Sequence, residues 1–162
     1  MRTLRQHDVM RILRTWCNAC ATSTRYHHAV TLPCLFGCRA RKDSLTHYLQ
    51  CPHMYALMKF FNSTTDSNPL IRFGLVNPNP ERLSLICCSF AGYHAVRRNV
   101  RKSSFAPVDM ELSYGDLRRF WTLFAEAFAA EAREHCIACA KFSVPEFVNF
   151  LVTANGSGSA SS

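Results

Sequence analysis

Four residues in one short stretch of this sequence have the types and spacing of metal ligands. Three residues separate Cys34 from Cys38, and three residues separate His47 from Cys51. Structural zinc sites take four thiolate or imidazole ligands in a tetrahedron, commonly as two pairs from two short elements. The spacing therefore predicts a Zn²⁺ site whose ligands are Cys34, Cys38, His47 and Cys51.

The second pair of ligands must lie on a helix if both side chains are to reach one ion. Asp43 or Ser44 can cap a short helix at this point, and residues at i and i+4 then project from one face about one turn apart. His53 is an alternative to His47. Its separation of two residues from Cys51 would turn it away from the pair, so we expect His47 to be the ligand.

The first pair of ligands brackets a turn that a glycine can make. Gly37 can adopt a positive φ, which lets the backbone fold back around a metal. Three thiolates around a dication leave a net negative charge. Arg39, Arg41 and Lys42 lie in the connection between the two pairs, where they can offset this charge.

Nine cysteines are many for 162 residues. Their number is odd and the first residues contain no uninterrupted apolar run, so we expect a reducing nuclear or cytoplasmic location rather than secretion. The alternative to a metal site is that the cysteines are buried separately. We expect this for Cys17 and Cys20, which lie on the apolar side of a helix. Core or surface thiols are expected at Cys87, Cys88, Cys136 and Cys139.

The positive charge of the chain is concentrated in its first part. Residues 1–102 carry 15 Lys and Arg against 4 Asp and Glu, whereas residues 103–162 carry 4 against 7. A basic surface of this kind predicts contacts with phosphates, and its alternative is a solvated face that binds nothing. No run of 18 apolar residues occurs, so we expect no membrane partner.

Apolar periodicity and capping residues predict a mainly α fold. The expected helices cover residues 4–20, 44–50, 52–61, 79–102, 114–141 and 143–152. The first is amphipathic, with Val9, Ile12, Leu13 and Trp16 on its apolar side. We expect a small zinc-stabilised basic module over residues 1–66, a helical domain over residues 67–154 and a flexible tail over residues 155–162.

The stretch "LRTWCNACATSTRYHH", followed by "CLFGCRARKDSLTHYLQCP" and an apolar helix, resembles the segment after the polymerase core in reverse transcriptases of non-LTR retrotransposons. In that family a thumb helix and a Thr-Ser-Arg connection lead to a CCHC zinc-binding module, whose ligands would fall on the four residues above. The resemblance covers roughly residues 10–62. It implies a role in holding template RNA or target DNA near a polymerase.

The sequence lacks the parts of a complete polymerase. A palm with paired aspartates is absent, as are the GxxxxGK, HExxH and GxSxG motifs of common enzyme classes. We therefore expect a segment without catalytic residues that binds RNA or DNA. The expected nucleic-acid contacts are Arg25, Tyr26, Arg39, Arg41, Lys42, Arg97, Arg98 and Arg101.

The rival hypothesis is a zinc-stapled helical module that binds proteins. Its contact surface would be the Phe-rich helices over residues 79–102 and 114–141, and its partner a second copy of the chain or a polymerase domain. A third possibility is the remnant of an element that folds but has no present function.

Overall fold

A computed structural model describes most of the chain. The described residues are 5–17, 22–25, 31–38, 41–61, 68–102, 112–135, 145–146 and 148–149. The helices are α1 (Gln6–Trp16), α2 (Leu45–Gln50), α3 (Pro52–Phe61), α4 (Pro69–Arg72), α5 (Pro80–Lys102) and α6 (Tyr114–Glu134). The predicted mainly α fold is confirmed. Within these residues, no helix has both the length and the apolar character needed to cross a membrane.

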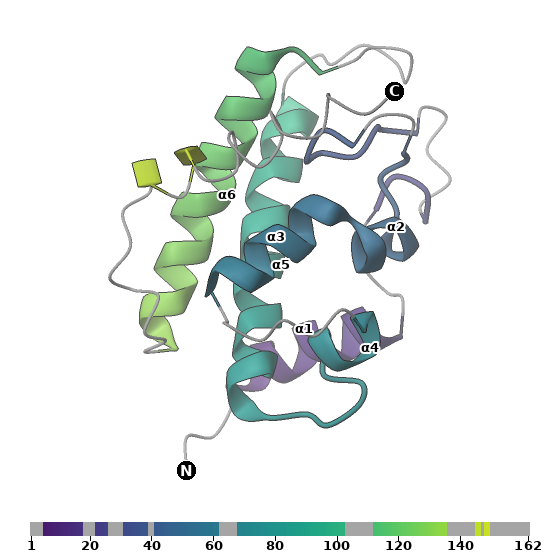
Figure 1. The fold of residues 1–162 in the computed structure, drawn as a ribbon, viewed down its shortest axis with the longest axis vertical. Coiled ribbons are helices and arrows are strands. Elements are labelled where there is room, and N and C mark those ends of the chain that lie inside the picture. The colour runs from purple at the N-terminus through teal and green to yellow at the C-terminus, as the bar shows by residue number, and fades with distance from the viewer. Residues whose placement is uncertain are drawn as a thin grey trace.

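Helices α5 and α6 run side by side through the centre of the molecule, as Figure 1 shows. Three phenylalanines and a tryptophan of α6 are fully buried or nearly so, namely Phe120, Trp121, Phe124 and Phe128. A Cβ at Gly92 of α5 would lie 2.6 Å from Cδ2 of Phe124. The absence of a side chain at this position therefore lets the two helices approach closely.

Local capping residues start these helices where the sequence predicts. Asn79 precedes α5, and its side chain accepts a hydrogen bond from the N–H of Arg82 at 2.8 Å. Ser113 precedes α6 and accepts from the N–H of Asp116 at 3.1 Å. The end of α6 was predicted too late, because the helix stops at Glu134 instead of near residue 141. The short α4, capped by the side chain of Asn68, was not predicted.

Helix α1 packs against α5 with a face that its apolar pattern does not predict. Its buried residues are Asp8, Ile12 and Thr15, whereas Leu13 and Trp16 of the apolar stripe are exposed. Only Ile12 of the predicted apolar side is therefore part of the core. The physical reason is a group of ion pairs around Asp8, which draws the polar side of α1 toward α6.

Buried residues from both predicted parts of the chain form one core. Leu35, Phe36 and Tyr48 from before residue 66 pack together with Ile86 and Phe124 from after it. The predicted boundary between residues 66 and 67 and the tail over residues 155–162 lie outside the described residues. The described parts of the two segments thus share a hydrophobic interior.

We predict that Gly92→Ala destabilises the fold by about 1–3 kcal/mol, because the new methyl group overlaps the Phe124 ring. Gly115→Ala is the matched control. It also lies in a helix, but its Cβ would meet only the Ser113 hydroxyl at 3.8 Å, so it should be neutral or slightly stabilising. Urea unfolding followed by circular dichroism measures both. Equal stability of the two variants would contradict the close approach of α5 and α6.

Candidate metal centre

The structure brings the four predicted ligands together. One ligand atom from each of Cys34, Cys38, His47 and Cys51 lies within 4.8 Å of all the others. The sulfurs of Cys38 and Cys51 are 3.5 Å apart. Cys34 and Cys51 are buried, and Cys38 and His47 are half-buried. The group therefore forms a compact Cys₃His cluster that could hold a metal ion.

The first pair of ligands lies on a tight loop. The N–H of Cys34 donates to the carbonyl of Arg41 at 2.7 Å, and the N–H of Gly37 donates back to the carbonyl of Cys34 at 3.0 Å. An isolated antiparallel bridge pairs Pro33 with Lys42 at the base of this loop. Gly37 has a φ of 85°, which confirms the predicted positive φ. The sulfurs of the first pair are thereby turned toward one point.

The second pair of ligands is placed by α2, as predicted. Ser44 caps this helix, and its hydroxyl accepts from the N–H of His47 at 3.2 Å. The Nε2 atom of His47 is buried, and no group in the described part of the chain forms a hydrogen bond with it. A buried imidazole nitrogen without a partner is costly unless it binds something. His53 lies instead beside the Trp121 ring, so it is not part of the cluster.

The three thiols titrate as a group. Burial raises the pKa of Cys34 far above its usual range, and hydrogen bonds with the other two cysteines raise it further. Hydrogen bonds with Cys34 and Cys38 lower the pKa of Cys51. Two thiols therefore stabilise one thiolate at Cys51. Because thiolates and not thiols ligate metals, a bound dication would replace the remaining protons.

A buried carboxylate attaches this loop to the helices. Oδ1 of Asp43 accepts from the hydroxyls of Tyr48 at 2.7 Å and Tyr93 at 2.8 Å. Oδ2 accepts from the N–H of Ser23 at 2.7 Å and from Nη1 of Arg97 at 3.1 Å. Asp43 thus joins the segment at residue 23, α2 and α5. The cap of α2 is Ser44 alone, and Asp43 serves as this central acceptor.

The predicted nucleic-acid contacts differ in their positions. Arg25, Arg41, Lys42 and Arg98 are exposed. Thr24 donates to the Asp43 carbonyl through its N–H and through its hydroxyl. The backbone of Arg25 therefore lies near the end of the loop that begins at Cys34, which we call the metal loop. Tyr26, Arg39 and the side chain of Arg101 lie outside the described residues.

The exposure of two residues contradicts their predicted roles. Arg97 is only 3% exposed, and its guanidinium is bound to Asp43 and to the hydroxyl of Tyr93. It therefore cannot reach a phosphate outside the protein. Cys17 was expected in the core but is exposed, because α1 turns its other side inward. Cys87 and Cys88 are buried, whereas Cys20, Cys136 and Cys139 lie outside the described residues.

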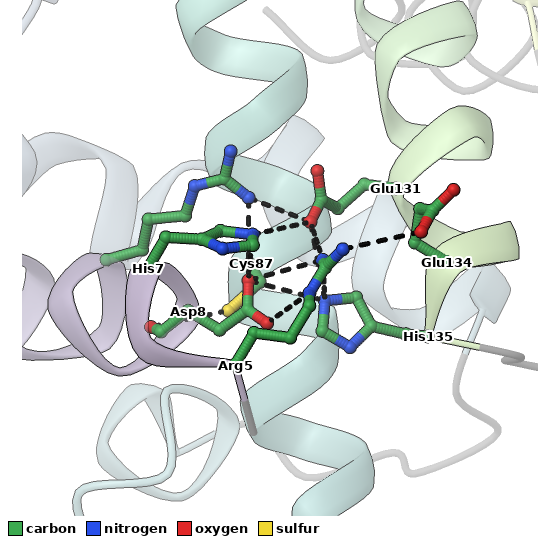
Figure 2. Close-up of polar contacts among 8 residues, drawn as sticks. Arg5, His7, Asp8, Cys87, Glu131, Glu134 and His135 are labelled. Atoms are coloured by element: carbon green, nitrogen blue, oxygen red, sulfur yellow. Dashed lines mark hydrogen bonds and ion pairs between the residues drawn. The ribbon is translucent and has the colours of Figure 1, made fainter. Parts of the chain in front are cut away.

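A second polar cluster joins the start of α1 to the end of α6 (Figure 2). Arg5 lies at its centre, with Nε 2.8 Å from Asp8 and further contacts to Glu131 and Glu134. Nε2 of His135 is 3.6 Å from Asp8 and 3.4 Å from Glu131. Burial alone would raise the pKa of Asp8, but its hydrogen bond with Arg5 and the nearby positive charges lower it. The sequence does not reveal this cluster, because its members lie more than 100 residues apart at the start of α1 and the end of α6.

The second cluster contains metal-ligating and nucleophilic groups, yet its geometry favours a structural role. Asp8, Cys87 and His135 approach one another, but the Arg5 guanidinium already provides the cation beside the carboxylates. Burial raises the pKa of the Cys87 thiol to about 12, and this thiol donates to the carbonyl of Asp8. The ion pairs therefore fix the orientation of α1.

Comparisons with protein-family models, with curated proteins and with solved structures gave no match. The chemistry of the cluster must accordingly be inferred from its own residues. Three sulfurs and one imidazole nitrogen make a complete tetrahedral ligand set.

We predict that Asp43→Asn destabilises the fold by about 3–5 kcal/mol, because it leaves the buried Arg97 without its counter-charge and sets an amide against hydrogen-bond donors. Tyr93→Phe is the graded control. It removes one donor to Asp43 and one acceptor of Arg97 but keeps the carboxylate, so it should cost only about 1–2 kcal/mol. Denaturant unfolding in the presence of metal measures both. Similar losses in the two variants would show that Asp43 is not the central acceptor.

Proposed function

We propose that the Cys₃His cluster holds one structural Zn²⁺ ion and that the basic surface beside it binds nucleic acid. The observation that carries the first part is His47, which has one ring nitrogen within 4.8 Å of all three cysteine sulfurs and whose buried Nε2 atom has no hydrogen-bond partner in the described part of the chain. An ion at this point would satisfy it.

The donor set selects the metal and its role. Thiolate and imidazole ligands in a tetrahedron favour zinc over the hard cations, which prefer oxygen. Four protein ligands leave no open coordination position for a substrate or for a reactive water. A zinc ion here would therefore hold the loop at residues 34–38 against α2 and would take no part in a reaction.

Exposed arginine and lysine side chains lie near the metal loop. Arg41 and Lys42 lie at the end of the metal loop and are exposed. The backbone of Arg25 is near them, because Thr24 donates to the carbonyl of Asp43. Arg98 follows the buried Arg97 on α5 and is exposed. Phosphates of RNA or DNA are the most common partners of such a surface. We expect it to hold a strand by its backbone, without reading its sequence.

The resemblance to the reverse transcriptase module supports the same function. It assigns zinc to these four residues and implies template RNA or target DNA as the ligand. The rival hypothesis placed a protein partner on the Phe-rich faces of α5 and α6. Several of those residues, including Phe120, Phe124 and Phe128, are already buried between elements of the chain itself.

We predict one zinc ion per purified chain, measured by elemental analysis. Cys38→Ser removes one of four ligands and should abolish zinc retention and lower the helical signal in circular dichroism. Cys17→Ser is the matched control, because that thiol is exposed and outside the cluster, and it should keep its zinc. Metal-free protein with full helical signal would refute the zinc centre.

We predict that affinity for RNA or DNA falls steeply with salt and that this dependence involves Arg41 and Lys42. Replacing both with Ala should lower the slope of log K against log salt by about one unit per lost phosphate contact. The control replaces Arg82 and Arg133 with Ala, which removes the same charge at the opposite end of the α5 and α6 pair. Filter binding over a salt series measures the slopes. Equal slopes for both double variants would exclude Arg41 and Lys42 from the interface.

A further inference from the structure

Two arginines of α6 lie next to the metal loop. Arg118 and Arg119 directly follow Leu117, and a Cβ built on Gly37 of the loop would be 2.9 Å from Cδ2 of that leucine. Both arginines are exposed. The sequence has its excess of positive charge within residues 1–102, so these two cations from the acidic remainder of the chain were not among the predicted nucleic-acid contacts.

The metal loop separates these arginines from the basic residues already described. Its base is the bridge between Pro33 and Lys42, where Arg41 and Lys42 are exposed. Its turn at Gly37 lies against the start of α6. Figure 1 shows the metal loop, the start of α6 and the end of α5 at the same end of the molecule. Exposed cations therefore lie near both the base and the turn of the loop.

Within the described residues, no contact neutralises Arg118 or Arg119. Neither side chain forms an ion pair or a hydrogen bond with a described residue. Asp116 lies three residues before Arg119, but its carboxylate accepts from the Ser113 hydroxyl at 2.6 Å. Helix dipoles favour cations in the last turn of a helix, whereas these arginines lie in the second turn of α6. Neither ion pairing nor the helix dipole therefore accounts for this pair of arginines.

The two ends of the α5 and α6 pair differ in how their cations are compensated. At the end that holds α1, Arg5 is bound to Asp8, and Nη1 of Arg11 is 2.8 Å from Glu131. At the metal-loop end, the exposed cations that form no ion pair with a described residue are Arg41, Lys42, Arg98, Arg118 and Arg119. Like charges repel one another, and a bound polyanion would relieve this repulsion.

We propose that Arg118 and Arg119 form a second phosphate-contact site, so that one nucleic-acid strand crosses the metal loop from its base at Arg41 and Lys42 to these arginines beside its turn. The inference rests on the proposed nucleic-acid function. It extends the interface to a helix outside residues 10–62, which carry the resemblance to the reverse transcriptase module. Guanidinium groups suit this role, because they can donate two parallel hydrogen bonds to one phosphate.

Binding of a labelled single strand, oligo(U) RNA or oligo(dT) DNA, to the purified full chain tests the proposal. Replacing Arg118 and Arg119 with Ala should lower the slope of log K against log salt by about 0.7 unit per lost phosphate contact. Replacing Arg41 and Lys42 should lower it in the same way. The two reductions should add when all four residues are replaced, because the contacts lie on one strand.

Two controls separate a phosphate contact from other effects. Replacing Arg82 and Arg133 with Ala removes the same charge at the opposite end of the α5 and α6 pair and should leave the slope unchanged. Replacing Arg118 and Arg119 with Lys keeps the charge and should keep the slope, because the slope counts neutralised phosphates. Helical signal in circular dichroism verifies that each variant is folded.

Three outcomes would overturn the proposal. One is an unchanged slope without Arg118 and Arg119 in a protein whose slope falls without Arg41 and Lys42, which would confine the interface to the base of the loop. Another is binding of two strands per chain, since the two groups would then be separate sites. The last is a Lys variant whose slope equals that of the Ala variant. Failure of the proposed function is distinct, because the unaltered chain would then bind neither RNA nor DNA.

Discussion

The placement of the metal loop depends on one buried carboxylate. Asp43 accepts hydrogen bonds from Ser23, Tyr48, Tyr93 and Arg97, which come from three separate parts of the chain. A buried charge is costly unless donors surround it, so the fold is stable only when all these segments meet at the same point. The Cys₃His cluster adds a second fixed point a few residues away. Together they attach a segment with little regular structure to the rigid α5 and α6 pair.

The few acidic residues of residues 1–102 explain how buried arginines are neutralised and why this part of the chain is basic. Residues 1–102 contain only four Asp and Glu, and two of them, Asp8 and Asp43, are fully buried. Asp8 forms an ion pair with the half-buried Arg5, and Asp43 forms one with the buried Arg97. Only Asp66 and Glu81 remain as carboxylates for the 13 other Lys and Arg residues of this part of the chain. The positive charge of this part of the chain therefore follows in part from the use of its carboxylates inside the protein.

Local features could be read from the sequence, whereas long-range ion pairs could not. The ligand spacing, the turn at Gly37 and the caps at Ser44, Asn79 and Ser113 each involve neighbouring residues, and all are confirmed. The exposure of Cys17 was not predicted because apolar periodicity does not register Glu131 and His135, which lie at the end of α6 and hold the opposite side of α1 inward. Arg97 was misjudged for the same reason, since a cation in a last helical turn looks exposed until its buried partner is known.

The antiparallel arrangement of α5 and α6 separates the two side-chain clusters of the molecule. The metal loop contacts the start of α6, where a Cβ on Gly37 would touch Leu117, whereas α1 is held at the end of α6 by Glu131 and His135. The Cys₃His cluster and the ion pairs of Asp8 therefore lie at opposite ends of the same helical pair. The helical pair therefore sets the distance between these two clusters.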